Sequence, residues 1–315
     1  MEVIHDILKP DFVIDHPTTI TIGNFDGVHK GHIEIIRRIR SIVKKNNSVP
    51  VVITFDPHPL SIISSGSPPE LLSTTTEKLK LLEAYNIPIV ALFPFNKRIS
   101  QNSAKWFLEN VLVGKLRVRN IVIGINHTFG RDREGNVEYL RKALLGTGIG
   151  LDVVKPLRSS GEMISSSAVR TALYQGDYKT ASAMLGHPYP LFGKIIPGKG
   201  VGSTLGYPTI NIQPGKHKLV PPIGVYACFI NIKNAFLGGM LYIGTRPTFG
   251  GKNIVIEIAC FSSLDVKAGD TLEVYALKYF RADVRFRSQG LLVDQIKKDE
   301  KAIRNYLRRR KIRLT

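Results

Sequence analysis

The chain has 315 residues, of which 43% are hydrophobic and 22% are charged. These proportions are ordinary for globular proteins and argue against a wholly disordered chain, and the length favours two domains of common size. Lys and Arg number 44 against 25 Asp and Glu, and the formal net charge of +19 favours anionic partners such as nucleotides, nucleic acid or an acidic surface.

The cysteine count, the apolar runs and the N-terminal sequence indicate where the protein is located in the cell. The two cysteines, Cys228 and Cys260, are too few for a disulfide framework and fit a reducing, cytoplasmic environment. No apolar run reaches the length of a membrane span. The N-terminus carries acidic residues early and lacks the apolar core of a signal peptide. We therefore expect a cytoplasmic protein without a membrane partner.

The first half of the chain alternates short apolar runs with helical patterns. The runs are rich in Val and Ile, as in strands that are buried on both faces, and the clearest helix carries a stripe of Ile and Val opposite Arg and Lys. This alternation predicts a doubly wound parallel sheet, on which ligands bind beyond the carboxyl ends of the strands. The predicted strands are 18–23, 50–55, 88–93, 120–125 and 151–156, and the predicted helices are 32–45, 77–85, 103–112 and 137–145.

The pattern changes after about residue 185. Residues 186–193 (GHPYPLFG) are dense in Gly and Pro and read as a linker, and short β runs broken by turns follow them. Many short strands at close spacing predict a small antiparallel barrel, which a helix over about 289–311 closes. We therefore expect one domain over 1–186 and a second over 187–315.

The C-terminal segment is strongly basic. Residues 278–315 contain 13 Lys or Arg and 4 Asp or Glu, with a dense run from Arg308 to Arg313. A nucleic-acid-binding patch is one interpretation of this run. A solvated helix end, whose cations complement the helix dipole, is favoured instead because no aromatic side chains alternate with the charges as stacking platforms.

The segment GNFDGVHKGH (23–32) lies where the first strand ends and the first helix begins. A glycine-rich turn of this kind presents backbone N–H groups and the positive end of a helix dipole to a ligand. His29 and His32 are three residues apart and share a helix face, where they could stabilise charge on a phosphoryl group. A plain helix cap with surface histidines is the alternative, and a zinc site lacks further ligands nearby.

Two later loops should lie beside this turn, because they also follow parallel strands. TFDPHP (54–59) offers His58 on a turn stiffened by prolines. GINHTFGRDREGN (124–136) offers Asn126, His127, Arg131 and Arg133, and Arg forks suit phosphate. If these segments did not follow parallel strands, TFDPHP would be interpreted as a rigid loop and 124–136 as a solvated basic loop.

A fourth segment, ISSSAVR (164–170), reads as the start of another helix. Ser165 can cap it, Ser166 lies in its first turn, and Arg170 lies one turn further on. Capping alone would account for the serines. Together with the two histidines, however, the segment would complete a two-sided cage for a triphosphate.

The second half contains two further candidates. In GKGVGSTLGYPTIN (198–211), the glycines allow backbone to approach an anion, and Thr209 and Asn211 point to one side of a strand as oxygen ligands for Mg²⁺ would. A glycine-rich hairpin is the alternative. Glu257 is a lone acid in the apolar run NIVIEIACF, which suggests either a general base or a glutamate that faces water at a strand edge.

These motifs, with LGYPTIN, GVYA and IGTRPTF, occur in the order found in bacterial bifunctional riboflavin kinase/FAD synthetases, and the chain resembles that family over roughly 15–300. The resemblance implies a Rossmann-like doubly wound nucleotidyltransferase domain followed by a small antiparallel β-barrel kinase domain with a C-terminal helix. It also implies two reactions in flavin biosynthesis: riboflavin and ATP give FMN, and FMN and a second ATP give FAD and pyrophosphate.

The resemblance also implies roles for individual residues. Glu257 matches the catalytic base of the kinase reaction, and His29 and His32 match groups that stabilise adenylyl transfer. Thr209 and Asn211 match ligands of Mg²⁺ and ATP. The implied contacts to ATP are Gly23, Phe25, His29, His32, Ser165, Ser166, Arg170, Gly198, Gly206, Thr209 and Asn211; those to flavin are His58, Asn126, Arg131 and Arg281.

The implied partners are the small molecules riboflavin, FMN and ATP, together with flavoproteins that receive the products. Two other functions remain open at this stage. One is a single-activity adenylyltransferase for FMN or another phosphorylated substrate, with a regulatory or weakly active barrel. The other is nucleic-acid binding driven by the +19 charge, which ranks low because binding ATP, FMN and FAD already accounts for a basic surface.

Overall fold

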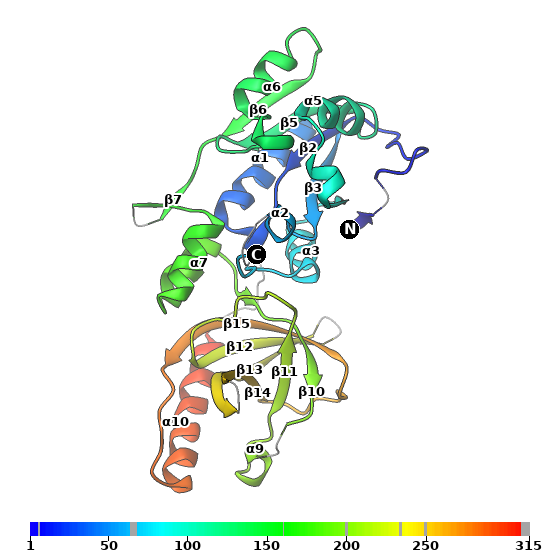
Figure 1. Cartoon of the computed structure of the whole chain (residues 1–315). Helices are drawn as coiled ribbons and strands as arrows, with labels where there is room; N and C mark the ends of the chain where they lie inside the picture. Colours follow the sequence, from blue (N-terminus) through cyan, green and yellow to red (C-terminus); the bar gives the residue numbers. More distant parts are fainter. Residues whose placement is uncertain are drawn as a thin grey trace. The chain divides into compact units, whose positions relative to one another are not determined.

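The computed structural model describes residues 1–5, 7–63, 68–159, 161–198, 201–232, 235–248 and 251–309. The chain forms two compact units (Figure 1). Unit 1 comprises Met1–Leu71 and Lys78–Ser166, and unit 2 comprises Leu72–Glu77 and Ser167–Thr315. The predicted basic run beyond Arg309 lies outside the described residues.

Unit 1 contains a six-stranded sheet in which every pairing is parallel, in the order β1-β4-β3-β2-β5-β6. All five predicted strands are confirmed: the four inner strands are mainly buried runs of apolar and β-branched residues, and the edge strand β6 is half-buried. The sixth, β1, is a three-residue edge strand. The strands are β1 (Glu2–Ile4), β2 (Thr18–Ile22), β3 (Val49–Asp56), β4 (Ile89–Pro94), β5 (Val118–Gly124) and β6 (Gly150–Val154).

Helices cover both faces of this sheet. Along β3, Val51 and Ile53 face the core shared with η2 and α6, whereas Val52 faces the core shared with α1 and α3, because side chains alternate along a strand. The predicted helix 103–112 is a short α-helix followed by a π-helical segment, η2. The elements are η1 (Asp26–Val28), α1 (Lys30–Asn46), α2 (Leu60–Ile63), α3 (Thr75–Ala84), α4 (Lys97–Ser100), α5 (Ala104–Trp106), η2 (Phe107–Val113), η3 (Arg131–Arg133), α6 (Val137–Ala143), and the hairpin β7 (Arg158–Ser159) and β8 (Glu162–Met163).

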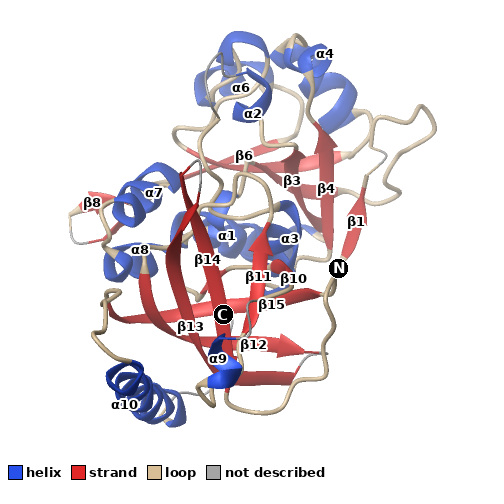
Figure 2. Ribbon diagram, turned by 60° about the horizontal axis from the view of Figure 1, so that its bottom comes forward, coloured by secondary structure: helices blue, strands red, loops and turns tan. Residues whose placement is uncertain are grey.

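Unit 2 is built on a closed antiparallel barrel with the strand order β10-β11-β14-β13-β12-β15, which a pairing of β10 with β15 closes. Figure 2 shows β13 and β14 as long, curved strands. The predicted barrel is therefore confirmed. Its strands are β10 (Gly193–Ile196), β11 (Ile210–Pro214), β12 (Gly224–Ile232), β13 (Ala235–Thr248), β14 (Gly251–Cys260) and β15 (Thr271–Arg281).

The helix α10 (Gln289–Arg308) runs along the outside of the barrel (Figure 1). Ile296, Ile303 and Leu307 recur at helical spacing and pack on Val225 and Met240 of the strands. Ser288 caps the helix by accepting a hydrogen bond from Leu291 N at 3.3 Å. The remaining helices of unit 2 are α7 (Ser166–Tyr174), α8 (Tyr178–Leu185) and α9 (Val201–Thr204).

The segment 186–193 is not the exposed linker that its composition suggests. The short strand β9 (Tyr189–Pro190) pairs with β15, and the side chain of Tyr189 is buried with its hydroxyl donating to Leu219 O at 2.8 Å. The prediction was wrong because tertiary pairing, which the local composition does not reveal, draws a segment rich in Gly and Pro into the core of unit 2.

A buried ion pair lies within unit 2. Glu77 and Lys218 are both fully buried, with Lys218 Nζ 2.9 Å from Glu77 Oε2. The other oxygen, Oε1, accepts from Phe192 N at 2.7 Å, and Lys218 Nζ also donates to Leu72 O. The segment Leu72–Glu77 thus supplies the carboxylate that balances a lysine in the interior of the unit that contains the barrel.

Glu77→Gln is expected to lower the free energy of unfolding by about 3–5 kcal/mol, because it leaves a buried ammonium without its carboxylate. Urea denaturation followed by circular dichroism measures this loss. Glu83→Gln is the matched control, since Glu83 is on the same helix, its side chain is 51% exposed, and its contacts with Lys80 and with the N-terminal amine are both 3.9 Å long. That variant should lose at most about 1 kcal/mol. Equal losses in both variants would contradict the importance of the buried pair.

Candidate functional site

The turn after β2 has an unusual backbone that places two histidines at the start of α1. Phe25, Gly27 and Val28 all have positive φ, and the helix begins at Lys30 with His29 at its N-cap position. Gly23 N donates to Ile53 O at 3.1 Å, which ties the turn to β3. The first helical turn, with its backbone N–H groups, therefore lies at the carboxyl end of the sheet, as the sequence predicts.

The rings of His29 and His32 stack, with their centroids 3.8 Å apart and an interplanar angle of 17°. Phe25 packs on His32 at a centroid distance of 4.8 Å. Gly31 makes room for this stack, because a Cβ at that position would lie 3.1 Å from the His29 ring. The spacing HxGH is thus a packing requirement as well as a chemical motif.

His32 is held in its neutral form. Burial lowers the pKa of His32 well below its ordinary value, and the nearby His29 and Lys78 lower it further. Its Nδ1 is buried and has no hydrogen-bond partner among the residues that the structure describes. A neutral imidazole with one nitrogen uncommitted within the protein can offer either a donor or an acceptor to a ligand.

Ser166 joins the fourth motif to this turn. Its hydroxyl donates to Asp26 O at 2.8 Å, although the two residues are 140 positions apart. Helix α7 begins at Ser166, so that Ser165 occupies the position expected of a cap. Arg170 lies one turn further along the same helix and is buried. The structure therefore brings the serines beside the HxGH turn.

The predicted site residues on the loops after β3 and β5 differ in their exposure to solvent. His58 is buried, and its Nδ1 accepts from Leu60 N at 3.2 Å, so this ring also shapes its own turn. Asn126 is exposed, with its amide 4.0 Å from Met163 Sδ. Arg131 is exposed and lies 3.8 Å from Asp132.

One lysine of this region was missed by the sequence analysis. Lys78 is only 3% exposed, and its Nζ donates to Thr54 Oγ1 at 3.1 Å and to Phe55 O at 3.2 Å. The signal that could have identified it is helical spacing, because Leu81 and Leu82 follow at three and four residues and form the buried face of α3.

His127 is a half-buried histidine whose Nε2 is enclosed, and it makes the stability of unit 1 depend on pH. Burial lowers its pKa to about 4, and its Nε2 has no hydrogen-bond partner within the described part of the chain. Below pH 6.5 the unfolded chain binds a proton that the folded chain does not, so the free energy of unfolding should fall as the pH decreases from 6.5 to about 4.

Replacing His127 by Phe, which can keep the ring stacked on Phe129, should reduce this loss by up to about 3 kcal/mol. Chemical denaturation at pH 7 and pH 4.5 measures the difference. His16→Phe at an exposed position is the control and should keep the pH dependence of the natural chain. A His127→Phe variant that loses as much stability at low pH as the natural chain would contradict the prediction.

Unit 2 contains a pocket of about 460 Å³ between the outer face of the barrel and α10. Three of the predicted site residues, Thr209, Glu257 and Arg281, line it. Its walls combine apolar side chains with a few polar groups, as ligand pockets commonly do. The other lining residues are Gly202, Leu205, Tyr207, Val225, Met240, Tyr242, Thr245, Val255, Ala259, Asp283, Val284, Phe286, Leu292, Ile296 and Asp299.

Glu257 lies on β14 with Asn211 of β11 on one side and Tyr242 of β13 on the other, each directly opposite it in the register. Burial raises the pKa of Tyr242 to about 12, and the carboxylates of Asp283 and Glu257 add to this effect. Tyr242 is therefore a neutral phenol at the site. From the sequence, Tyr242 was expected only to be part of a barrel strand.

Two glycines pack closely against the predicted oxygen ligands. A Cβ on Gly198 would collide with the amide of Asn211, and a Cβ on Gly202 would lie 3.0 Å from Thr209 Oγ1. Gly206 has a φ of +79°, which L side chains rarely adopt. Asn211 is buried, and Thr209 is half-buried. The two glycines therefore let the backbone at positions 198 and 202 pack closely against the predicted oxygen ligands.

Arg281 is fixed in position by α10. Its Nε and Nη2 donate to Asp299 Oδ2 at 2.8 and 2.7 Å, and Gln295 Nε2 donates to the other oxygen, Oδ1, at 2.8 Å. Asp299 is buried, so the ion pair orients the guanidinium at the edge of the pocket. Asp299 is a second residue that the sequence analysis missed.

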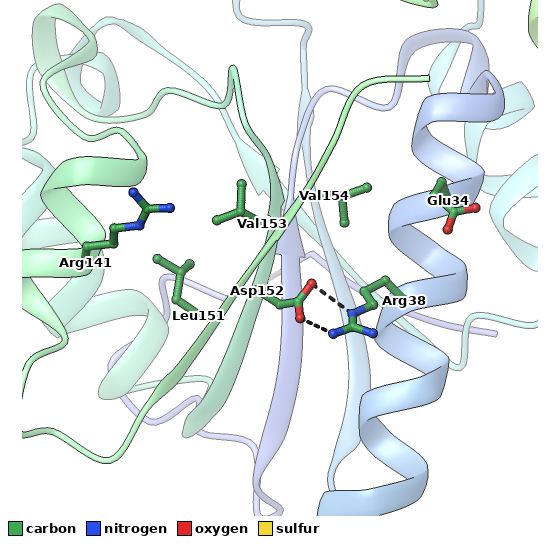
Figure 3. A pocket seen from close by; sticks show the side chains of 7 residues that line it. All are labelled: Glu34, Arg38, Arg141, Leu151, Asp152, Val153 and Val154. Carbon is green, nitrogen blue, oxygen red and sulfur yellow. Dashed lines mark hydrogen bonds and ion pairs between the residues drawn. The ribbon is translucent and has the colours of Figure 1, made fainter. Parts of the chain in front are cut away.

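A separate, more open pocket of about 440 Å³ lies on unit 1 against the edge strand β6 (Figure 3). Arg38 of α1 forms a bidentate pair with Asp152 of β6 and is itself largely exposed, and Arg141 of α6 lies on the opposite side of the strand. None of the predicted site residues lines this pocket. Its paired charges do not suggest a binding function.

Two other kinds of feature are absent from the described ranges. No cluster of three or more His, Cys, Asp or Glu side chains there could hold a metal ion. Among the same residues, no helix is both long and apolar enough to cross a membrane.

Comparisons with known proteins match both halves of the chain. Residues 12–168 match the family model described as FAD synthetase, and residues 185–307 match the model described as riboflavin kinase. Together the two models account for most of the chain. Their order along the sequence is the order of unit 1 followed by the barrel.

Curated bacterial proteins are similar over nearly the whole length. The bifunctional riboflavin kinase/FMN adenylyltransferase of Escherichia coli K12 is 33% identical over 288 residues, which cover 91% of this chain and 92% of that protein. The Bacillus subtilis protein of the same description is 31% identical over 319 residues, covering 99% and 100%.

A solved structure is similar as well. A protein from Streptococcus pneumoniae, described as a macrolide-efflux protein, superposes with a TM-score of 0.84 and 28% identity. The superposition covers 96% of this chain and 98% of that one. The two chains therefore share both folds.

Proposed function

The chain belongs to the family of bifunctional riboflavin kinase/FMN adenylyltransferases, and from this premise we propose which of its residues perform the two reactions. Unit 2 phosphorylates riboflavin with ATP to give FMN. Unit 1 transfers the adenylyl group of a second ATP to FMN, which gives FAD and pyrophosphate. We further propose that the two catalytic domains divide near residue 186.

In adenylyl transfer, a phosphate oxygen of FMN attacks the α-phosphorus of ATP. The new bond joins the two phosphates, the bond to the β-phosphate breaks, and pyrophosphate leaves with the electron pair. This direct displacement needs no protein nucleophile, so the task of the protein is to position the reactants and stabilise negative charge. The stacked His29 and His32 at the start of α1 are well suited to that task.

The other residues predicted for the adenylyl-transfer site have supporting roles in this proposal. The hydrogen bond from Ser166 to Asp26 O supports a shared phosphate site, in which Ser165, Ser166 and Arg170 hold the leaving pyrophosphate. Gly23 and Phe25 form the wall of the ATP site. The residues on the flavin side are His58, Asn126 and Arg131.

In the kinase reaction, Glu257 accepts the proton of the terminal ribityl hydroxyl as that oxygen attacks the γ-phosphorus of ATP. The bond to the β-phosphate breaks, and ADP leaves. The observation that carries this assignment is the position of Glu257 on the wall of a pocket of about 460 Å³, which Thr209 also lines. Glu257 lies directly opposite Asn211 in the strand register. A general base needs this kind of enclosed position next to its substrate.

The oxygens of Thr209 and Asn211 would hold Mg²⁺, since they are hard ligands of the kind it prefers and Thr209 lines the same pocket as Glu257. When bound, Mg²⁺ would neutralise charge on the phosphates of ATP. Gly198 and Gly206 let the backbone approach the same phosphates. Arg281, held by Asp299, contacts the flavin.

The wider setting follows from the substrates. We place both reactions in the cytoplasm, where ATP is available and where Cys228 and Cys260, both unbridged, remain reduced. Flavoproteins that bind FMN or FAD are the recipients of the products.

A chromatographic product assay tests the proposal with the purified full-length protein, riboflavin, ATP and Mg²⁺. We expect FMN to appear first and FAD to follow. Omission of Mg²⁺ should stop both reactions. FAD formed from supplied FMN, without FMN from riboflavin, would support a single-activity adenylyltransferase instead. No product from either substrate would refute the assignment.

A further inference from the structure

Lys78 is a buried lysine that the reactions as described do not use. It lies in the first turns of α3 and is 3% exposed. Its Nζ donates to Thr54 Oγ1 at 3.1 Å and to Phe55 O at 3.2 Å, and both acceptors are near the carboxyl end of β3. A lysine on a surface helix would normally extend into water, so this burial requires an explanation.

From Lys78 a chain of hydrogen bonds reaches the turn that precedes His29. The hydroxyl of Thr54 donates its single proton to Asn24 O at 3.0 Å, and it must therefore accept from Lys78. Asn24 lies between Gly23 and Phe25, whose strained turn sets the position of the stacked histidines. Two hydrogen bonds thus link α3 to this turn through β3.

The ammonium group of Lys78 interacts with other charged groups at the same edge of the sheet. Burial lowers the pKa of Lys78 to about 8, whereas the carboxylates of Asp26 on η1 and Asp56 on β3 act to raise it. In turn, the ammonium group and His29 act with burial to lower the pKa of His32. The charged and titratable groups that act on Lys78 and His32 therefore belong to η1, β3, the start of α1 and α3.

We propose that Lys78 is a positioning residue for adenylyl transfer: its ammonium group holds the Gly23–Phe25 turn in place through Thr54 and supplies positive charge beside Asp26 and Asp56. It acts on the reaction through the turn and the histidines that the turn carries. This inference rests on the proposed assignment of adenylyl transfer to His29 and His32.

A dependence on alkaline pH follows. As the pH rises through about 8, Lys78 loses its proton and its charge, and Nζ can no longer balance the two carboxylates. Adenylyl transfer should therefore decline over that range. Phosphorylation of riboflavin in unit 2 should not share a decline at this pH, because Lys78 belongs to unit 1.

The test uses full-length Lys78→Met and Lys78→Arg, with both reactions measured from pH 6.5 to 9.5. Lys78→Met should lower kcat for FAD formation roughly 10- to 100-fold, as small displacements of reacting groups do. Lys78→Arg, which stays charged throughout, should recover part of this activity and lose the decline near pH 8. FMN formation should change less than about twofold in either variant.

Lys80→Met is the matched control, because Lys80 is on the same helix and is more exposed; it should keep the activity and pH profile of the natural chain. Natural rates and pH profile in Lys78→Met would overturn the inference. So would an equal loss of both reactions with a lower melting temperature, which would indicate a structural role only. Natural FAD formation in His32→Ala would overturn the proposed histidine site. The rates of FAD formation in Lys78→Met and Lys78→Arg would still show whether Lys78 itself is needed, so the two failures can be told apart.

Discussion

Glu257→Gln is expected to abolish the conversion of riboflavin to FMN and to leave the conversion of supplied FMN to FAD unchanged. Glutamine keeps the size and hydrogen-bonding shape of the side chain but cannot accept a proton in the neutral range. Loss of a general base lowers a rate by about 100- to 10,000-fold. Because Glu257 lies on β14 of the barrel, the loss should be confined to the kinase reaction.

Chromatographic separation of FMN and FAD measures both reactions in one preparation. Glu273→Gln is the matched control, because Glu273 is on the barrel strand β15 but is not among the residues that line the pocket. Its Oε2 accepts from Asn231 Nδ2, an arrangement that glutamine can preserve, so both activities should survive. Kinase activity in Glu257→Gln within about tenfold of the natural rate would remove Glu257 from the role of base.

Much of the fold could be predicted because its elements have strong local patterns. All five residues of β2 are buried, and such a run of apolar or β-branched residues has few alternatives to a central strand. The edge strand β1 was missed because three residues carry too little pattern. The burial of segment 186–193 was missed because its pairing partner, β15, is more than eighty residues away.

The composition of the site could be predicted only in part. The rule that parallel strands share a carboxyl edge correctly placed the turn that leads to HxGH beside the end of β3, as the hydrogen bonds from Gly23 N to Ile53 O and from Thr54 Oγ1 to Asn24 O indicate. Lys78, Tyr242 and Asp299 escaped because their importance depends on burial and on partners distant in sequence. A lysine, a tyrosine and an aspartate in ordinary amphipathic segments have no local feature that distinguishes them from surface residues.

The histidine pair could be predicted from the sequence more easily than the residues that hold it in place. HxGH is a compact motif whose glycine and spacing are both required by the stack of the two rings. Its support, in contrast, comes from Thr54 and Lys78, which lie 22 and 46 residues beyond His32. Motifs therefore reveal the groups that contact a ligand more readily than the residues that hold those groups in place.

His32→Ala is expected to lower the rate of FAD formation by roughly 100-fold or more, as removal of a preorganised donor does, while FMN formation stays at its natural rate. Ala removes the imidazole and leaves a gap beside Phe25 and His29, both of which contact the ring. Since burial, His29 and Lys78 all lower the pKa of His32, its imidazole is neutral at pH 7 and should not titrate in the neutral range. The natural rate should therefore show no inflection from this residue between pH 6.5 and 8.

Steady-state assays with supplied FMN and ATP measure the effect, and His16→Ala at an exposed position of the same unit is the control. A His32→Ala variant that keeps the natural rate of FAD formation would restrict His32 to packing at the start of α1. A loss that appears only as a higher KM for ATP would mean that His32 binds the ground state and the transition state equally. A fall in kcat with an unchanged melting temperature would identify the imidazole as a group that acts during the transfer itself, because only interactions that strengthen in the transition state raise kcat.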